Sequence, residues 1–254
     1  MKSLIFFSGT KGGTGKTTLA LNTAVVLAYA WRNDAQYPVV LLDLTPGLGT
    51  ASLILLGDYL AAWGRPSLSD YFAGKISDPL RAFYLKRWTT DRGDFQLVFA
   101  YLTQDVNVSR RYLEYLVQNV ETRLRPKLLV IDAPPMAQSP HLSGLVNFVA
   151  PVVTPDISAI EATKYYLGSM GGTRLKPVLN MYMPEYQISA VYLAHWERVV
   201  ERSLGEPPHI VPYDKAIQAA RQALEIEVLK LRPSESPGVR AILEYAKYLS
   251  AKLL

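Results

Sequence analysis

A glycine-rich segment near the N-terminus constrains the fold of this chain more than any other feature. The segment Ser8-Gly-Thr-Lys-Gly-Gly-Thr-Gly-Lys-Thr-Thr18 lies between an apolar run typical of a strand and a long stretch with helical spacing. Glycines at 12, 13 and 15 allow a tight loop with inward backbone N–H groups, because no Cβ blocks a ligand. The following helix directs its positive end at the same point. The order strand, loop and helix therefore predicts a phosphate-binding loop.

Short runs of apolar, β-branched and aromatic residues recur along the chain and predict strands. These runs are Leu4–Ser8, Val39–Asp43, Leu97–Ala100, Leu128–Asp132, Phe148–Thr154, Val178–Met181 and Ile210–Pro212. Several are apolar on both faces, which is typical of a parallel sheet covered by helices on both sides. The intervening stretches with helical spacing are Thr17–Trp31, Val108–Arg123, Ser158–Gly168, Ile188–Leu204, Lys215–Lys230 and Val239–Leu254.

This alternation predicts a doubly wound α/β fold with a mostly parallel β-sheet flanked by helices, the P-loop NTPase fold. No linker rich in glycine, serine or proline divides the chain, so we expect one domain over residues 1–254. Residues 57–94 are less regular, because glycines and prolines interrupt them. We expect short helices and loops there, at one edge of the fold.

Composition excludes several kinds of site. The chain has no cysteine, which excludes disulfides, thiolate zinc sites, cysteine-held iron–sulfur clusters and cysteine nucleophiles. A net charge of +5 permits contact with nucleic acid or an anionic membrane without deciding between them. The apolar run Leu19–Trp31 is too short to span a bilayer, and Leu4–Phe7 leads into the glycine loop without a cleavage site. We therefore expect a cytoplasmic protein.

The side chains of the glycine-rich segment fit the chemistry of a nucleoside triphosphate. Lys16 is placed to reach the β- and γ-phosphates, and the Thr17 hydroxyl to ligate Mg²⁺. Thr10 stands where the usual pattern has glycine, so the match is to the variant Lys-Gly-Gly-x-Gly-Lys-Thr. In this respect the segment resembles the deviant Walker-A ATPases typified by ParA and MinD. Within this group, the sequence is most similar to the ParA-like partition ATPases.

The resemblance implies an ATPase that uses ATP and Mg²⁺ and forms a homodimer in the ATP state. Lys11 would cross the dimer interface and touch the partner subunit's nucleotide, acting in catalysis together with Lys16 and Asp43. The phosphate-binding residues that the resemblance implies are Lys11, Gly12, Gly13, Thr14, Gly15, Lys16, Thr17 and Thr18. The alternative for Lys11 is a solvated loop lysine.

Two aspartates end apolar strands at their carboxyl ends, where open parallel sheets build ligand sites. Val39–Pro46, which contains Asp43, resembles the second strand and switch I of the family, and Leu128–Pro135, which contains Asp132, resembles its switch II. We expect both carboxylates to hold waters around Mg²⁺ and to sense the γ-phosphate. The alternative is that each starts a turn or caps a helix.

One position departs from the family pattern. Members carry a second aspartate two residues after the position of Asp43, and this chain has Thr45 there. A hydroxyl can hydrogen-bond the attacking water but has no negative charge to polarise it. We expect slow hydrolysis, and a non-hydrolysing nucleotide-gated binding module remains an alternative.

Two later segments resemble the parts of the family that contact the base and ribose. They are Val178–Asn180, with Asn180 toward the base, and Ile210–Asp214, with Pro212, Tyr213 and Asp214 in the closing loop. An amide offers a donor and an acceptor to a base edge. The alternative is that Asn180 caps a strand and that the loop is only a turn before a helix.

Within the family that the sequence resembles, the absence of cysteine excludes the members that hold an iron–sulfur cluster between subunits. The members that remain are mainly ATPases that position cargo. We expect non-specific DNA binding by the ATP dimer, for chromosome or plasmid partition, with a ParB-like or other activating partner. The basic residues available are Arg81, Lys86, Arg87, Arg110, Arg111, Arg123, Arg125, Lys127, Arg198, Arg202, Lys215, Arg221, Lys230, Arg232, Arg240 and Lys247. A MinD-like, membrane-associated ATPase is the alternative. The apolar stripe of the last helix, from Ile242 to Leu253, is expected to pack in the core rather than on lipid.

Overall fold

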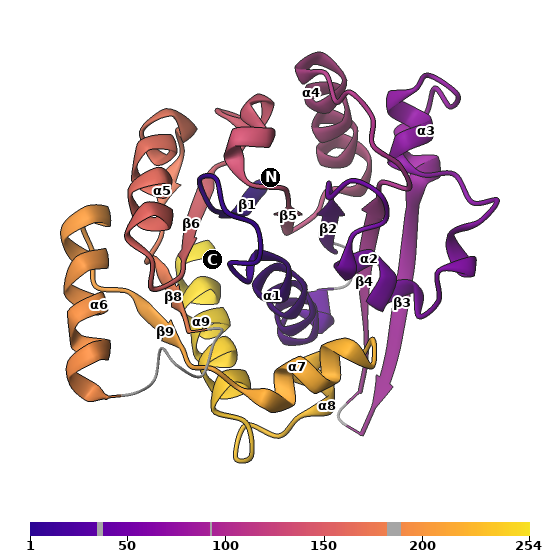
Figure 1. Ribbon diagram of the computed structural model, residues 1–254. Coiled ribbons are helices and arrows are strands. Elements are labelled where there is room, and N and C mark those ends of the chain that lie inside the picture. The colour runs from indigo at the N-terminus through magenta and orange to yellow at the C-terminus, as the bar shows by residue number, and fades with distance from the viewer. Residues whose placement is uncertain (35–37, 92, 182–188) are drawn as a thin grey trace.

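The computed structural model describes residues 1–34, 38–91, 93–181 and 189–254. Within these residues one sheet has the strand order β3-β4-β2-β5-β1-β6-β8-β9, with β7 beside β6 (Figure 1). The strands are β1 Lys2–Phe7, β2 Val39–Asp43, β3 Phe83–Thr90, β4 Gly93–Tyr101, β5 Leu128–Asp132, β6 Phe148–Val153, β7 Thr173–Arg174, β8 Val178–Asn180 and β9 His209–Val211. All the strand pairs are parallel except β3 with β4. The predicted doubly wound α/β fold is confirmed.

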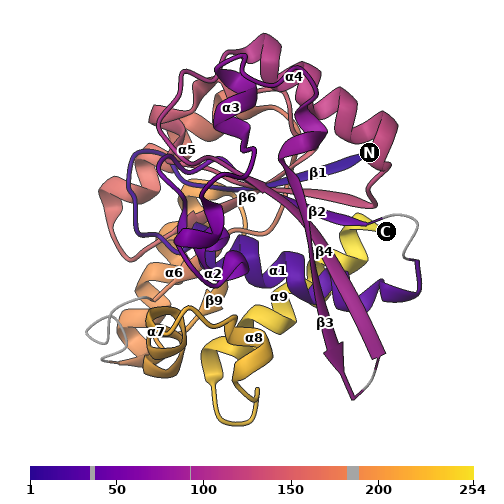
Figure 2. The ribbon, with the colours of Figure 1, turned by 90° about the vertical axis from the view of Figure 1, so that its right-hand side faces the viewer.

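Helices cover both faces of the sheet, with α3 and α4 above it and α1 and α9 below it in Figure 2. The helices are α1 Lys16–Ala30, α2 Thr50–Leu56, α3 Leu68–Phe72, α4 Arg110–Asn119, α5 Ile157–Met170, α6 Ala190–Leu204, α7 Lys215–Gln222, α8 Glu227–Lys230 and α9 Pro237–Leu253. Strands β2 and β5 are buried at every position, as the unbroken apolar runs predicted. Among the described residues, none of the helices combines the length and the apolar composition that a membrane span requires.

The main difference from the sequence prediction lies in residues 57–94. Alongside short helical segments, this region forms the edge strand β3, which pairs antiparallel with a β4 that begins earlier than expected, at Gly93. Every second residue of β3 from Leu85 to Thr89 is exposed, so polar and apolar residues mix and no apolar run marks the strand. Strand β3 can therefore be identified only from its pairing with β4.

Two helices begin or end at residues that differ from the sequence prediction. The predicted helix over 215–230 divides into α7 and α8, because the chain turns at Leu224, whose φ is +57°. Helix α6 begins at Ala190, with the Ser189 hydroxyl as its N-cap. The first residue predicted for that helix, Ile188, lies outside the described residues.

The sheet gathers the polar ends of three neighbouring strands. Asp43 at the end of β2 is the register partner of Asp132 at the end of β5. Strand β1 pairs with β5 on the other side and leads into the glycine-rich loop. The carboxyl ends of parallel strands meet at one edge, so the fold places both aspartates beside that loop.

Candidate functional site

The glycine-rich loop is fitted closely to its surroundings. A Cβ on Gly9 would lie 2.5 Å from the backbone carbon of Ala162 in α5, so only glycine allows this approach. Gly15 has a φ of +95°, and a Cβ there would lie 2.1 Å from Nδ2 of Asn180. That amide donates a hydrogen bond of 2.9 Å to the carbonyl of Thr14. The loop is therefore held by α5 on one side and by the end of β8 on the other.

Lys16 lies buried under this loop, with its side chain aimed at the loop's start. Its Nζ donates a hydrogen bond of 2.9 Å to the hydroxyl of Ser8, and the residue is 7% exposed. Burial lowers the pKa of Lys16, while the charge of Asp132 opposes this shift. No carboxylate of the described residues lies within ion-pair distance of Lys16. A buried cation of this kind is stabilised by an anion.

The two strand-end aspartates have different surroundings. Asp43 accepts hydrogen bonds from the Thr45 N–H at 3.0 Å and from the N–H and hydroxyl of Ser52 at 3.0 and 2.6 Å. Asp132 is fully buried, and neither carboxylate oxygen has a hydrogen-bond partner among the described residues. Burial, followed by repulsion from Asp43, raises the pKa of Asp132 to about 7.

These side chains fit the magnesium ion that the sequence implies. The unpartnered oxygens of Asp132 are hard acceptors, and carboxylates and hydroxyls suit Mg²⁺. Thr17 adds a hydroxyl close enough to Asp132 to oppose the rise that burial causes in the pKa of that carboxyl. Among the described residues no group of three or more His, Asp or Glu side chains could hold a metal ion alone. A site built from Thr17, Asp43 and Asp132 therefore needs substrate oxygens or water to complete it.

Lys11 lies on the exposed side of the loop and pairs with Asp156 of the same chain. Asp156 is also the N-cap of α5, where it accepts a hydrogen bond from the Ala159 N–H at 3.0 Å. The Lys11 ammonium is the main cause that lowers the pKa of Asp156. The lysine is thus held by a surface ion pair, a weak interaction that another anion can displace.

A cavity of about 500 Å³ adjoins the loop on the side of α7. Its lining includes Gly15, Asn180, Pro212, Tyr213, Asp214 and Arg221. The residues predicted to contact the base and ribose are therefore brought together beside the glycine-rich loop. The Asp214 carboxylate is already engaged, because it caps α7 through the Ala216 N–H and accepts hydrogen bonds from Ser236 and Gly238.

Arg221 is a candidate site residue that the sequence suggested only as one of many basic residues. It projects from α7, and its Nη1 donates a hydrogen bond to the hydroxyl of Thr18. Burial raises the pKa values of Asp132 and of Glu227, a glutamate that is 1% exposed, and the charge of Arg221 opposes both rises. Asn22 of α1 donates a hydrogen bond of 2.7 Å to Glu227. The only sequence signal was the basic residue within the helix after the closing loop.

Several other basic residues are engaged in ion pairs. The pairs are Arg110 with Glu114, Arg123 with Asp78, Lys127 with Asp34, Lys230 with Glu225 and Arg232 with Glu235. The apolar stripe of α9 is buried, as predicted: Ile242, Tyr245, Ala246, Leu249 and Leu253 are at most 2% exposed. Most of this stripe packs in the same core as α1.

Solved structures of MinD and ParA proteins share this fold. Pyrococcus furiosus cell division ATPase MinD is 24% identical, covers 99% of both chains and has a TM-score of 0.73. Septum site-determining protein MinD from Pyrococcus horikoshii, complexed with Mg-ADP, is 23% identical over 98% of this chain and 96% of that one, with a TM-score of 0.72. The pNOB8 ParA bound to nonspecific DNA is 12% identical over 98% and 99% of the chains, with a TM-score of 0.63.

No protein-family model and no curated protein sequence matches the chain. The structural matches show that the chain has the fold of the MinD and ParA P-loop ATPases, as its glycine-rich loop indicated.

Proposed function

We propose that this protein binds ATP with Mg²⁺ and uses it as a switch that controls dimerisation, as an ATPase of the ParA/MinD type. The observation that carries this proposal is the juxtaposition at the loop of a buried lysine and a buried carboxylate. Lys16 has no ion-pair partner among the described residues and Asp132 has no hydrogen-bond partner there. Both are explained by a ligand that brings phosphate anions and a cation.

Each side chain has a defined task in this proposal. Lys16 contacts the β- and γ-phosphates, and Asn180 with the Pro212–Asp214 loop encloses the base and ribose. Thr17, Asp43 and Asp132 hold Mg²⁺, which neutralises phosphate charge when it is bound. Lys11 leaves Asp156 and reaches the nucleotide of a second subunit, so two nucleotides are enclosed in a two-fold dimer.

Calorimetry with ATP, ADP and adenosine tests the proposal directly. We expect ATP and ADP to bind in the presence of Mg²⁺, and Lys16→Ala to weaken both. Arg232→Ala is the matched control, because Arg232 lies on the surface and pairs with Glu235. A folded wild-type protein that binds no adenine nucleotide would refute the proposal.

The presence of threonine at position 45 supports the proposal that ATP hydrolysis is slow. The Thr45 N–H donates to Asp43, so the residue lies at the switch I corner, where a second aspartate would carry charge. A phosphate-release assay compares the wild type with Thr45→Asp. We expect the substitution to accelerate hydrolysis, and equal, fast rates in both proteins would contradict this role. No release from either protein supports the non-hydrolysing binding module instead.

We further propose DNA as the surface that the ATP dimer binds, as in chromosome or plasmid partition. Burial of the α9 stripe supports DNA over lipid, because those apolar side chains are occupied in the core. Doubling the number of phosphate contacts in a dimer makes DNA affinity depend on nucleotide state. DNA retardation without nucleotide, with ADP and with ATP, across a salt series, tests this. ATP-dependent, salt-sensitive retardation is expected.

A membrane surface is the second candidate. The two MinD structures described above have larger TM-scores than the ParA structure, and Leu254 at the end of α9 is exposed. ATP-dependent binding to liposomes in place of DNA would select this candidate.

A further inference from the structure

We propose that a second cavity, beside the switch I loop, binds a peptide segment of a partner protein that carries an acidic side chain next to a large apolar one. The cavity has a volume of about 500 Å³, equal to that of the cavity beside the glycine-rich loop. Leu48, Tyr59, Trp63, Arg65, Ile76 and Thr103 are among the residues that line it. We call it the switch-side cavity.

The rim of the switch-side cavity exposes unusually large apolar side chains. Tyr59, Leu60 and Trp63 are 54%, 63% and 73% exposed, and they lie within one short segment around a 3₁₀ turn. A cluster of this kind beside a cavity marks an interaction site more often than isolated surface residues do. Tryptophan and tyrosine are also the side chains that anchor protein interfaces most strongly. The rim therefore favours a partner that brings an apolar side chain.

The charge of the cavity selects an acidic partner. Three charged side chains line it, and two of these, Asp70 and Lys75, pair with each other at 3.3 Å. Arg65 has no carboxylate within ion-pair distance among the described residues, and its guanidinium lies 5.6 Å from the centre of the Tyr84 ring. Lys86 does not line the cavity, but it follows Tyr84 by two residues on β3 and so lies on the same face of the sheet. An extended segment with carboxylates complements this basic edge.

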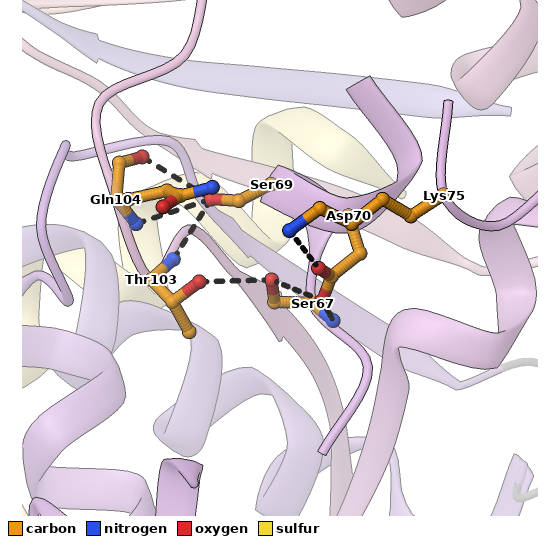
Figure 3. Close-up of polar contacts among 6 residues, drawn as sticks. All are labelled: Ser67, Ser69, Asp70, Lys75, Thr103 and Gln104. Atoms are coloured by element: carbon orange, nitrogen blue, oxygen red, sulfur yellow. Dashed lines mark hydrogen bonds and ion pairs between the residues drawn. The ribbon is translucent and has the colours of Figure 1, made fainter. Parts of the chain in front are cut away.

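The part of the cavity lining that Asp70 and Thr103 form is preformed. Figure 3 shows the hydrogen bonds that join the start of α3 to the chain after β4. Asp70 accepts hydrogen bonds from the N–H and hydroxyl of Ser67, and the Ser67 hydroxyl lies 3.0 Å from that of Thr103. The Ser69 hydroxyl accepts hydrogen bonds from the Thr103 and Gln104 N–H groups at 3.0 and 3.2 Å. A wall fixed in this way binds a segment without first becoming ordered, which favours affinity.

One lining residue connects the cavity to switch I. Leu48 has a φ of +63°, a left-handed conformation that costs energy for leucine, and its N–H donates to the Leu102 carbonyl at 2.9 Å. The next residue, Gly49, packs so closely on Asp43 that a Cβ would lie 2.4 Å from Oδ2. A peptide against Leu48 therefore contacts the loop that also carries Thr45. If the proposed ATPase function is correct, the site would let the partner act on hydrolysis through switch I.

Selection from random displayed peptides tests the binding site without nucleotide, and so independently of the proposed function. Peptides are selected on the wild type and counter-selected on Trp63→Ala and Arg65→Glu variants whose folding is verified by circular dichroism. We expect sequences with Asp or Glu beside Trp, Phe or Leu. For a selected peptide, either substitution should weaken binding by about thirtyfold, the effect of an interface hot spot. Arg232→Glu, at a solvent-exposed arginine outside the cavity, should leave binding unchanged.

Three results would overturn the inference. The first is that no peptide enrichment depends on Trp63 and Arg65. The second is that the enriched sequences lack acidic residues. The third is that Trp63-dependent binding to anionic liposomes or single-stranded DNA is stronger than binding to the selected peptides. If selected peptides bind but ATP does not, the proposed function fails and the site stands. If the peptides bind and ATP hydrolysis is unchanged by them, only the connection through Leu48 fails.

Discussion

Asp43 and Asp132 end two adjacent parallel strands at the same register position, yet among the described residues only Asp43 accepts close hydrogen bonds from neighbouring donors. Ser52 and the Thr45 N–H stabilise the charge of Asp43, whereas buried Asp132 has the Thr17 hydroxyl nearby but no hydrogen-bond partner in the described part of the chain. Like charges in such proximity disfavour ionisation of both carboxyls. The two carboxylates therefore repel each other, and a bound cation would reduce this repulsion.

Asparagine substitutions of these two residues should have opposite effects on stability without ligand. Asp132→Asn removes the charge from a buried, unpartnered carboxyl, so we expect the free energy of unfolding to rise by about 1 kcal/mol at pH 8. Asp43→Asn leaves some of its donors without an acceptor and should cost about 1–3 kcal/mol. Urea unfolding without nucleotide or Mg²⁺ measures both. Destabilisation by both substitutions would contradict the assignment of Asp132 as the unsatisfied partner.

The ion pair between Lys11 and Asp156 should restrain dimerisation. Asp156→Asn removes the negative charge but keeps an oxygen that can accept from the Ala159 N–H, so α5 remains capped. Because an exposed ion pair contributes about 0.2–1 kcal/mol, we expect ATP-dependent dimers to tighten by up to about fivefold. Sedimentation with ATP measures this change. Lys11→Ala is the companion variant: it should retain nucleotide binding and lose the dimer, and persisting dimers would refute its role.

Arg221 should contribute to binding of the phosphates rather than of the nucleoside. Its contact with Thr18 and its place in the lining of the cavity, together with Gly13 and Gly15, hold the guanidinium beside the loop that we propose binds the phosphates. We expect Arg221→Ala to weaken the binding of ATP and ADP at least tenfold, which is the range of a charge-assisted hydrogen bond. The binding of adenosine should change little. Calorimetry with the three ligands separates these effects, and Arg221→Lys should restore part of the affinity. Equal losses for adenosine and ADP would indicate a purely structural arginine.

His209 should make stability fall in mildly acidic solution. Burial lowers the pKa of His209, although the hydrogen bond from its Nε2 to the Ala241 carbonyl opposes this. The unfolded chain, with a histidine pKa of about 6.5, then binds the proton more readily than the folded chain. Stability is therefore complete above about pH 7.5 and declines as the pH falls through 6.5 toward the lower folded pKa.

Urea unfolding at pH 8 and pH 5.5 measures this dependence. His209→Gln, which keeps a donor for Ala241, should reduce the difference between the two pH values. Burial also lowers the pKa of His141, so some dependence should remain in the single variant and decline further with His141→Gln. An unchanged pH dependence in both variants would exclude the histidines as its source.

Much of the site followed from local sequence. The glycine-rich loop could be predicted because its residues are contiguous and their backbone requirements are local: Gly13 and Gly15 both have positive φ. The strand-end positions of Asp43 and Asp132 followed from unbroken apolar runs. The hairpin of β3 and β4 could not be predicted in this way, because an edge strand with one covered face mixes polar and apolar residues.

The sequence by itself determined the α/β fold, the glycine-rich loop and which side chains stand at the carboxyl ends of the strands, because strand period, helix start and glycine geometry are encoded in neighbouring residues. Only the tertiary structure decided the partners of those side chains. Lys11 meets Asp156 across 145 residues, and Arg221 meets Thr18 across 203. Such contacts depend on how the helices pack over the sheet, and that packing also decides that Asp43 accepts hydrogen bonds while Asp132 accepts none from the residues that the structure describes.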